Sequence, residues 1–281
     1  MAGMTTLTAH TATLDVPGGR LAYDVAGDGP PLLLVHAGVT DRRMWDDVWD
    51  GLARTHTVIR HDTRGFGETV ITDPAVAYSN RADIVALLDH LGIERGALCG
   101  VSRAGSIVID TALESPDRVS ALIPVAAGLG GFEVEPTPQE LEVFTELERL
   151  EQAKDWDAVI EHELRIWIDG VGQPADRVPD IRRRVEPMLR RIYGERLGDG
   201  DVDVIPLQPR AVGRIAGLRL PALVIVGDLD TPETIASCRH TSLTIPGARL
   251  VVLSGVAHLP PMERPAEFTE LVTMFLTEAG A

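Results

Sequence analysis

The sequence predicts an α/β fold in which a mostly parallel sheet carries helices on both faces. A short, continuous apolar run at 31–36 and further strand patterns at 57–61 and 220–226 alternate with stretches whose apolar residues recur at helical spacing. Such runs are typical of strands buried on both faces of a parallel sheet. Their regular alternation with helices favours parallel pairing, because a crossover helix returns the chain to the same edge. The 281 residues, 44% of them hydrophobic, suffice for one large domain with an insertion.

The first 128 residues contain most of the predicted elements. Two strands, at 11–16 and 20–25, are expected on either side of a turn at Pro17-Gly18-Gly19. An amphipathic helix is expected over 42–53, where tryptophan and aliphatic residues recur at helical spacing. The other expected elements are a strand at 57–61, a helix around 84–91, a strand at 97–99, a helix at 106–113 and a strand at 119–126.

The alternation stops after Gly128, and residues 129–212 are expected to form a helical insertion. Three prolines are expected to break its helices: Pro174, Pro179 and Pro187. Its acid-rich half and its arginine-rich half are expected to be solvated faces or to pair with each other. Because the insertion leaves and rejoins the core at strand ends, we expect it to form a lid.

The core is then made of residues 1–128 and 213–281. In its second part, strands are expected at 220–226 and 249–253. Pro265 is expected to open a C-terminal helix, because proline is favoured in the first turn.

The composition argues against several classes of function. A net charge of −16 disfavours nucleic acid or an anionic membrane as a partner. Two cysteines do not make a disulfide framework and favour a reducing compartment. The first residues lack the pattern of a signal peptide, and no apolar stretch could span a bilayer, so we expect a cytoplasmic protein. Without a phosphate-binding loop or a metal-ligand spacing, we expect neither a cofactor nor a metal.

The chemistry is expected to centre on the stretch Gly100-Val101-Ser102-Arg103-Ala104-Gly105. An apolar run leads into it and a helical pattern follows. Ser102 is therefore expected on a sharp strand-to-helix turn, with its hydroxyl exposed at the carboxyl edge of the sheet. A serine hydroxyl is a weak nucleophile that needs a base and a group to orient that base.

Two other predicted strands end in suitable partners for Ser102. Asp230 follows the strand at 220–226, and His258 follows the strand at 249–253. Ligands of open α/β sheets bind outside the carboxyl ends of the strands, so these side chains are expected to converge. Asp228 is a rival for the position of the acid.

These motifs, together with the stretches Leu34-Val35-His36-Ala37-Gly38 and Asp62-Thr63-Arg64-Gly65-Phe66-Gly67, resemble α/β-hydrolases with a helical cap. The resemblance runs from about Leu21 to the C-terminus and is to small bacterial esterases and lactonases. It implies a catalytic triad in the family's chain order, with Ser102 as nucleophile, Asp230 as orienting acid and His258 as base. The family's spacing favours Asp230 over Asp228.

The resemblance also implies an oxyanion hole formed by the backbone N–H groups of Gly38 and Arg103. The family's strand-end pattern usually reads His-Gly-x, whereas this chain has His36-Ala37-Gly38. His36 is interpreted as a structural residue that ties down this loop. Asp62 and Arg64 are interpreted as braces of the neighbouring loop.

On the expected strand-to-helix turn, Ser102 stands at the position where haloalkane dehalogenases and epoxide hydrolases of this fold have aspartate. A serine at this position favours acyl chemistry. The sequence thus predicts a serine hydrolase that cleaves an ester or lactone of a small molecule through an acyl-enzyme. The alternatives are a carbon–carbon bond hydrolase or an acyltransferase with the same triad, or a noncatalytic ligand-binding protein.

Three side chains are candidates for substrate contact. Arg103 follows the nucleophile, where the family usually has an uncharged residue, and its guanidinium could bind a substrate carboxylate. The alternative is that Arg103 pairs with a neighbouring acid. Trp167 and Ile168 of the insertion are expected either to line the pocket or to pack against the core.

Overall fold

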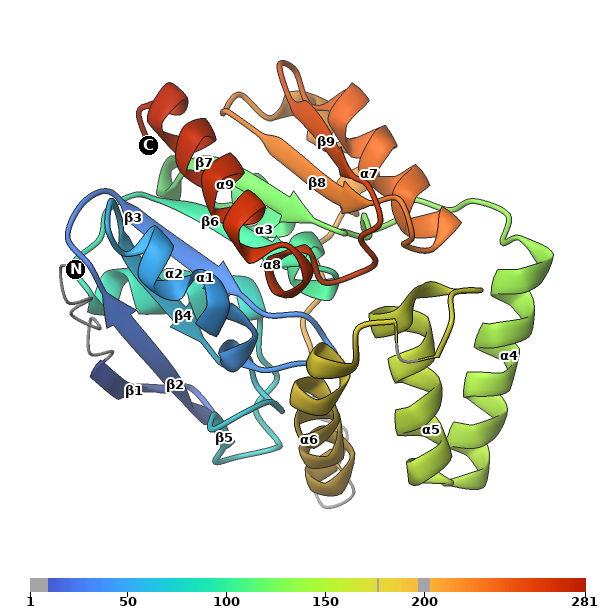
Figure 1. Cartoon of the computed structure of the whole chain (residues 1–281). Helices are drawn as coiled ribbons and strands as arrows, with labels where there is room; N and C mark the ends of the chain where they lie inside the picture. Colours follow the sequence, from blue (N-terminus) through green and yellow to red (C-terminus); the bar gives the residue numbers. More distant parts are fainter. Residues whose placement is uncertain (1–9, 176, 197–202) are drawn as a thin grey trace, which may run out of the picture.

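The computed structural model describes residues 10–175, 177–196 and 203–281. Its strands are β1 (His10–Val16), β2 (Gly19–Ala26), β3 (Pro31–Val35), β4 (Thr57–His61), β5 (Val70–Ile71), β6 (Gly96–Val101), β7 (Val119–Val125), β8 (Leu223–Gly227) and β9 (Arg249–Leu253). In this part of the chain they form one sheet in the order β1-β2-β4-β3-β6-β7-β8-β9, with β5 paired to β2. From β4 to β9 every pairing is parallel, whereas the pairings of β2 with β1, β4 and β5 are antiparallel. The predicted mostly parallel sheet is confirmed (Figure 1).

The helices of the core are η1 (Arg42–Trp45), α1 (Asp46–Leu52), α2 (Asn80–His90), α3 (Arg103–Glu114), η2 (Pro116–Arg118), η4 (Ala211–Gly213), η5 (Ile215–Gly217), α7 (Pro232–Thr244), α8 (Pro260–Glu263) and α9 (Pro265–Ala279). The helix expected over 42–53 is split into a 3₁₀ turn and a short α-helix. The Asp41 side chain accepts the N–H of Arg43 and caps the 3₁₀ turn. The Pro265 helix begins where it was predicted.

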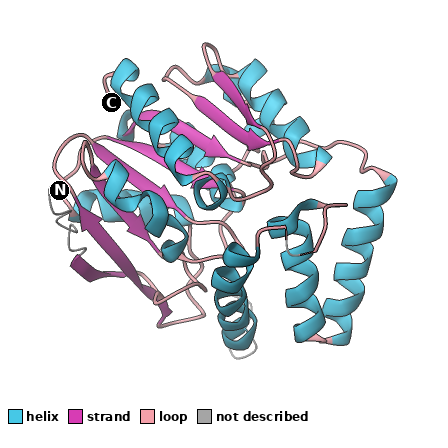
Figure 2. Cartoon of the chain, viewed as in Figure 1, coloured by secondary structure: helices cyan, strands magenta, loops and turns pink. Residues whose placement is uncertain are grey.

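Alternate residues of the central strand β3 belong to two different hydrophobic cores, one on either face of the sheet. Leu32 and Leu34 belong to the core that also contains residues of α1 and α9. Leu33 and Val35 belong to the core that contains residues of α2 and α3. This period of two places helices against both faces (Figure 2).

The helical insertion lies between β7 and β8 and consists of α4 (Pro138–Ala153), α5 (Trp156–Glu163), the π-helix η3 (Leu164–Gly170) and α6 (Pro179–Arg196). Residue 176 and residues 197–202 of the expected range lie outside the described residues. The expected break at Pro187 is wrong, because Pro187 lies inside α6. The buried residues Val185 and Leu189 hold α6 in one hydrophobic core on both sides of the proline.

Two ion pairs join the acidic and basic halves of the insertion, in agreement with the pairing alternative. Arg182 of α6 contacts Glu161 of α5 at 2.7 Å, and Arg190 contacts Asp157 at 2.6 Å. In Figure 1 the insertion extends away from the sheet below the ends of β8 and β9. None of the described helices is both long enough and apolar enough to cross a lipid bilayer.

Candidate active site

Ser102 occupies the turn between β6 and α3 in a backbone conformation that few non-glycine residues adopt. Its φ is 59° and its ψ is −123°. Gly100 permits the turn, because a Cβ there would lie 2.3 Å from the carbonyl oxygen of Ala104. The following helix begins at Arg103, earlier than expected, so Ser102 stands directly at its N-terminus. Strain at a single residue on such a turn is a frequent feature of functional sites.

His258 and Asp230 form a buried pair in the loops after β9 and β8. The His258 Nδ1 atom lies 2.9 Å from both carboxylate oxygens of Asp230. Both residues are buried, and Asp230 Oδ1 also accepts the backbone N–H of Thr231 at 2.7 Å. Because Nδ1 faces only acceptor oxygens, it carries the proton and leaves Nε2 to accept one.

Asp228, the rival acid, has a different role in the structure. Its Oδ1 accepts the backbone N–H of Gly255 at 2.6 Å, and its Oδ2 accepts the Ser254 hydroxyl at 2.9 Å. Asp228 therefore fixes the loop after β9, whereas Asp230 contacts the imidazole that this loop carries.

Gly38 and Arg103 are neighbours, as a shared oxyanion hole requires. A Cβ on Gly38 would lie 3.9 Å from the Arg103 Cβ. His36 fixes the Gly38 segment, because its Nδ1 donates to the Ala37 carbonyl at 2.8 Å and its Nε2 accepts the Thr63 N–H at 3.0 Å. Complete burial lowers the pKa of His36, so the ring is neutral, which suits one donating and one accepting nitrogen.

A network of carboxylates and guanidiniums braces the loop after β4. Asp62 accepts the backbone N–H groups of Arg42 and Glu68, both at 2.8 Å, and also contacts the Arg42 guanidinium. Arg64 donates to both oxygens of Asp83 at 2.8 Å. These contacts agree with the bracing roles interpreted from the sequence for Asp62 and Arg64.

The Arg103 guanidinium lies against the same loop. Its Nη2 donates to the Thr63 hydroxyl at 2.6 Å, and its Cζ lies 4.7 Å from the ring centroid of Phe66. Phe66 in turn packs against His36, with ring centroids 5.0 Å apart. The Arg103 side chain therefore links the start of α3 to the Gly38 segment.

Ser102 and His258 line one cavity of about 390 Å³. Its other lining residues are Arg103, Ser106, Ala126, Gly128, Leu129, Gly130, Gly131, Phe132, Trp167, Arg210, Thr231, Glu233, Thr234 and Ser237. Trp167 of the insertion packs on the His258 ring with centroids 4.5 Å apart. Ile168 does not line this cavity: it is 1% exposed and packs in the hydrophobic core, so the core-packing alternative holds for it and the pocket-lining alternative is wrong.

Arg177 is a residue of this region that sequence reasoning missed. It donates to the carbonyls of Asp169 at 2.7 Å and Ile168 at 3.0 Å, and to that of Gly255 at 3.1 Å. It also pairs with Glu263 at 2.5 Å. Arg177 therefore joins the end of η3 to the loop that carries His258.

Glu263, the partner of Arg177, also contacts the residue that precedes His258. Its Oε1 accepts the backbone N–H of Ala257 at 2.9 Å. Burial raises the pKa of the Glu263 carboxyl, against the lowering effect of the Arg177 guanidinium. The contacts span 78 and 86 residues of sequence, so no local pattern marks them.

Glu140 makes a second connection between the insertion and the core. Its Oε2 accepts the N–H of Thr137 at 2.8 Å, which completes a capping box at the start of α4. Its Oε1 accepts the N–H of Glu233 in the first turn of α7, also at 2.8 Å. Burial works to raise the pKa of Glu140, but these hydrogen bonds outweigh it and lower the pKa. The Thr-x-x-Glu spacing could have indicated the cap of α4, but not the contact with α7.

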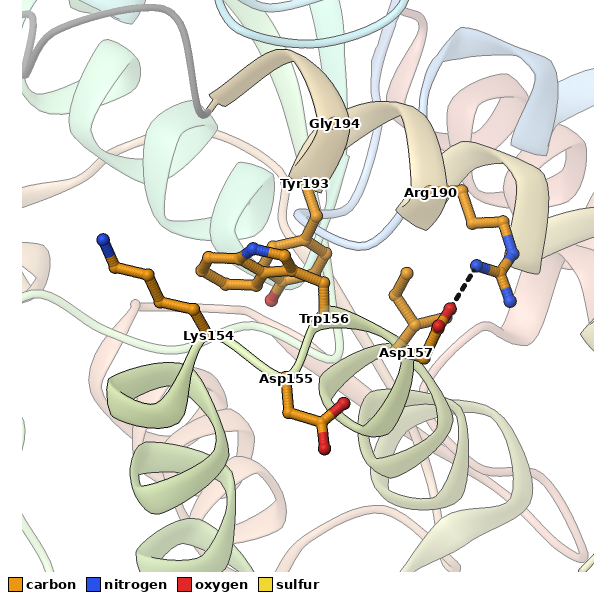
Figure 3. Close-up of a pocket in the computed structure, with 8 residues that line it drawn as sticks. Lys154, Asp155, Trp156, Asp157, Arg190, Tyr193 and Gly194 are labelled. Carbon is orange, nitrogen blue, oxygen red and sulfur yellow. Dashed lines mark hydrogen bonds and ion pairs between the residues drawn. The ribbon is translucent and has the colours of Figure 1, made fainter.

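A second cavity, of about 340 Å³, lies within the insertion (Figure 3). Trp156 and Tyr193 stack there with ring centroids 5.4 Å apart, and Arg190 pairs with Asp157. None of the site residues predicted from the sequence lines it. The chemistry expected at the sheet edge is therefore separate from this cavity.

Comparisons with known proteins agree with this architecture. The pimeloyl-[acyl-carrier protein] methyl ester esterase of Aeromonas hydrophila is 27% identical over 261 residues, covering 89% of this chain and 96% of the esterase. The 2-hydroxy-6-oxo-6-phenylhexa-2,4-dienoate hydrolase of Comamonas testosteroni is 28% identical over 145 residues, covering 49% of this chain and 51% of that hydrolase. The crystal structure of the enol-lactonase from Burkholderia xenovorans LB400 superposes with a TM-score of 0.74 at 25% identity, covering 95% of this chain and 100% of the lactonase.

The family described as alpha/beta hydrolase fold matches residues 30–265. This range begins at β3 and ends where α9 begins, so it includes Ser102, Asp230 and His258. The sheet order and the helices on both faces agree with that match. The chain belongs to the alpha/beta hydrolase fold family.

Proposed function

We propose that this protein is a serine hydrolase that cleaves a carboxylic ester or lactone of a small molecule. The observation that carries the proposal is the placement of Ser102 and His258 on one cavity, with His258 Nδ1 2.9 Å from both oxygens of Asp230. The similarity to an esterase and to an enol-lactonase supports the same class of reaction.

In the proposed reaction His258 Nε2 takes the Ser102 proton as the oxygen attacks the substrate carbonyl. The tetrahedral intermediate expels the alcohol, which receives that proton from His258 and leaves an acyl-enzyme. A water molecule then gives its proton to His258 and attacks the acyl carbon. The acid leaves as Ser102 regains its proton. Asp230 holds the imidazole in orientation and stabilises its charged form.

The oxyanion is stabilised by the backbone N–H groups of Gly38 and Arg103. Support comes from their adjacency and from His36, which anchors the Gly38 segment through Ala37 and Thr63. Removing one donor of this kind in a serine hydrolase costs about 3–4 kcal/mol of transition-state stabilisation.

The helical insertion, residues 129–212, acts as a lid domain on the core formed by 1–128 and 213–281. Trp167 contacts both the cavity and the His258 ring, which supports a role in substrate contact. A lid that excludes water strengthens electrostatic interactions at the reacting carbonyl.

The proposal is tested by turnover and by labelling. Purified protein should hydrolyse p-nitrophenyl esters or simple lactones, and a fluorophosphonate should modify Ser102, as located by mass spectrometry. Ser102→Ala should abolish both results, whereas Ser106→Ala, one helical turn away, should still be labelled. Turnover that survives in Ser102→Ala would rule out Ser102 as the nucleophile.

Hydrolysis of a carbon–carbon bond is a second candidate, favoured by the similarity to the Comamonas hydrolase. It would use the same three residues. Cleavage of a vinylogous 1,5-diketone together with failure on all esters and lactones would favour this reaction over the first.

A further inference from the structure

Helix α7 contributes polar residues to the lining of the Ser102 cavity. The buried face of a helix is usually apolar. Thr234, Ser237 and Thr241 recur at positions that share one helix face, and all three are buried. The first two line the cavity. This face therefore presents hydroxyl groups to the space beside the nucleophile.

Ser237, on this face of α7, has a buried hydroxyl that points to a ligand. It is 2% exposed, and its hydroxyl has no hydrogen-bond partner among the described residues. A buried hydroxyl without a partner costs free energy, so natural proteins almost always provide one. A polar atom of a bound ligand at this wall would satisfy it.

The cavity also has an excess of positive charge in a strongly acidic chain. Two basic residues, Arg103 and Arg210, are among its lining residues, against one acidic residue, Glu233. Arg103 is held against Thr63 and Phe66. Arg210 passes over Gly131, where an added Cβ would lie 3.0 Å from the Arg210 Cβ. Among the described residues no ion pair of Arg210 is found; its charge acts to lower the pKa of the Asp110 carboxyl, which burial raises and which does not line the cavity.

We propose that the substrate of this site is an ester that carries a carboxylate, bound by the Arg210 guanidinium and by the Ser237 hydroxyl. Arg103 adds positive potential beside the reacting carbonyl. Guanidinium and hydroxyl donors together suit a carboxylate, which accepts several hydrogen bonds in one plane. The inference rests on the proposed serine hydrolase function, because it identifies the substrate class of that same cavity.

Two matched pairs of esters test the inference. Monomethyl succinate is compared with methyl butanoate, where the carboxylate is on the acyl side, and acetoxyacetate with propyl acetate, where it is on the alcohol side. Values of kcat/KM are measured by pH-stat in 0.15 M salt, which screens long-range attraction. Each kcat/KM is divided by the rate constant for hydroxide-catalysed hydrolysis of the same ester, which removes differences in the intrinsic reactivity of the esters. The charged ester should be favoured by about tenfold or more in at least one pair.

Two arginine variants separate local binding from net charge. Arg210→Gln should remove most of the preference for the charged ester. Arg239→Gln changes the net charge equally at an exposed position of α7 that does not line the cavity. It should leave the preference intact. An equal response of both variants would overturn the inference.

Ser237→Ala gives an independent readout. It should lower kcat/KM for the charged ester several-fold without lowering the melting temperature, because the hydroxyl that it removes makes no hydrogen bond within the described part of the chain. A lower melting temperature with unchanged selectivity would mean a structural hydroxyl and count against the inference.

The two proposals fail in different ways. If neutral esters are hydrolysed as well as the charged ones in both pairs, the inference is wrong and the hydrolase function stands. If Ser102 supports no ester turnover at all, the proposed function is wrong and the inference falls with it.

Discussion

Arg177 of the helical insertion and Glu263 of α8 form an ion pair whose other contacts reach the loop that carries His258. The distance between Arg177 Nη2 and Glu263 Oε2 is 2.5 Å, and the Glu263 side chain is 2% exposed. The same carboxylate holds the N–H of Ala257, the residue before His258. The position of His258 thus depends on a residue of the insertion.

Arg177→Met should destabilise the protein by about 3 kcal/mol, because it leaves the Glu263 carboxylate buried without its cation. Adding Glu263→Gln in the same chain should recover part of the loss. Arg183→Met, which removes only the exposed pair with Asp180, should cost about 0.5 kcal/mol or less. Urea unfolding measures all three variants. Equal losses in Arg177→Met and Arg183→Met would contradict the buried connection.

Asp230→Asn should lower kcat by about 10⁴-fold while the protein stays folded, because the amide no longer stabilises the charged imidazole. Asp228→Asn should keep activity within a few-fold, since its side chain serves Gly255 and Ser254 rather than His258. Steady-state kinetics beside a thermal melt separates the two. Loss of activity in Asp228→Asn alone would reverse the assignment of the acid.

Trp167 and Ile168, adjacent in η3, should respond in opposite ways to truncation. Ile168→Ala should cost about 2–5 kcal/mol of stability, because it opens a cavity in the hydrophobic core. Trp167→Ala should change the preference among acyl chain lengths, because the indole lines the cavity and covers the His258 ring. Rates with esters of increasing length and a urea titration are the two measurements. Unchanged chain-length preference in Trp167→Ala would assign the indole to packing alone.

The buried histidines should make the protein less stable in acid. Burial lowers the pKa of His61 to about 3 and also lowers that of His36. In the unfolded chain these rings take up protons below about pH 6.5, whereas the folded chain does not bind them. The free energy of unfolding should therefore fall as pH drops below about 6.5, by up to about 1.4 kcal/mol per pH unit for His61 down to about pH 3, and His36 should add to the loss. His61→Gln should have a shallower slope in urea titrations between pH 7 and 4.5; an identical slope would contradict the assignment.

The strands were predictable because their signal is local. Leu32 to Val35 form a continuous apolar run, and burial on both faces requires nothing else of that segment. The residues after each strand could be placed at one edge of the sheet for the same reason. The convergence of Asp230 and His258 follows from parallel pairing of β8 and β9.

The sequence could not indicate features that depend on distant partners or on irregular backbone. The π-helix η3 differs from 3.6 residues per turn, so periodicity did not show that Trp167 faces the cavity and Ile168 the core. For Arg103 the sequence left a substrate carboxylate and a neighbouring acid open. Its hydroxyl partner, Thr63, lies 40 residues away in sequence.

The Glu140 carboxylate attaches the start of α4 in the insertion to the start of α7 in the core. This carboxylate accepts the Thr137 N–H at the start of α4 and the Glu233 N–H in the first turn of α7, so a displacement of α4 at that end breaks the hydrogen bond to α7. Arg177 clamps the end of η3 in the same way. These two contacts thus attach the insertion to the core at α7 and at the loop that carries His258. The turn at Lys154 lies at the opposite end of α4 from the hydrogen bond of Glu140, so we expect any motion of the insertion to be largest there, away from the loops that carry Asp230 and His258.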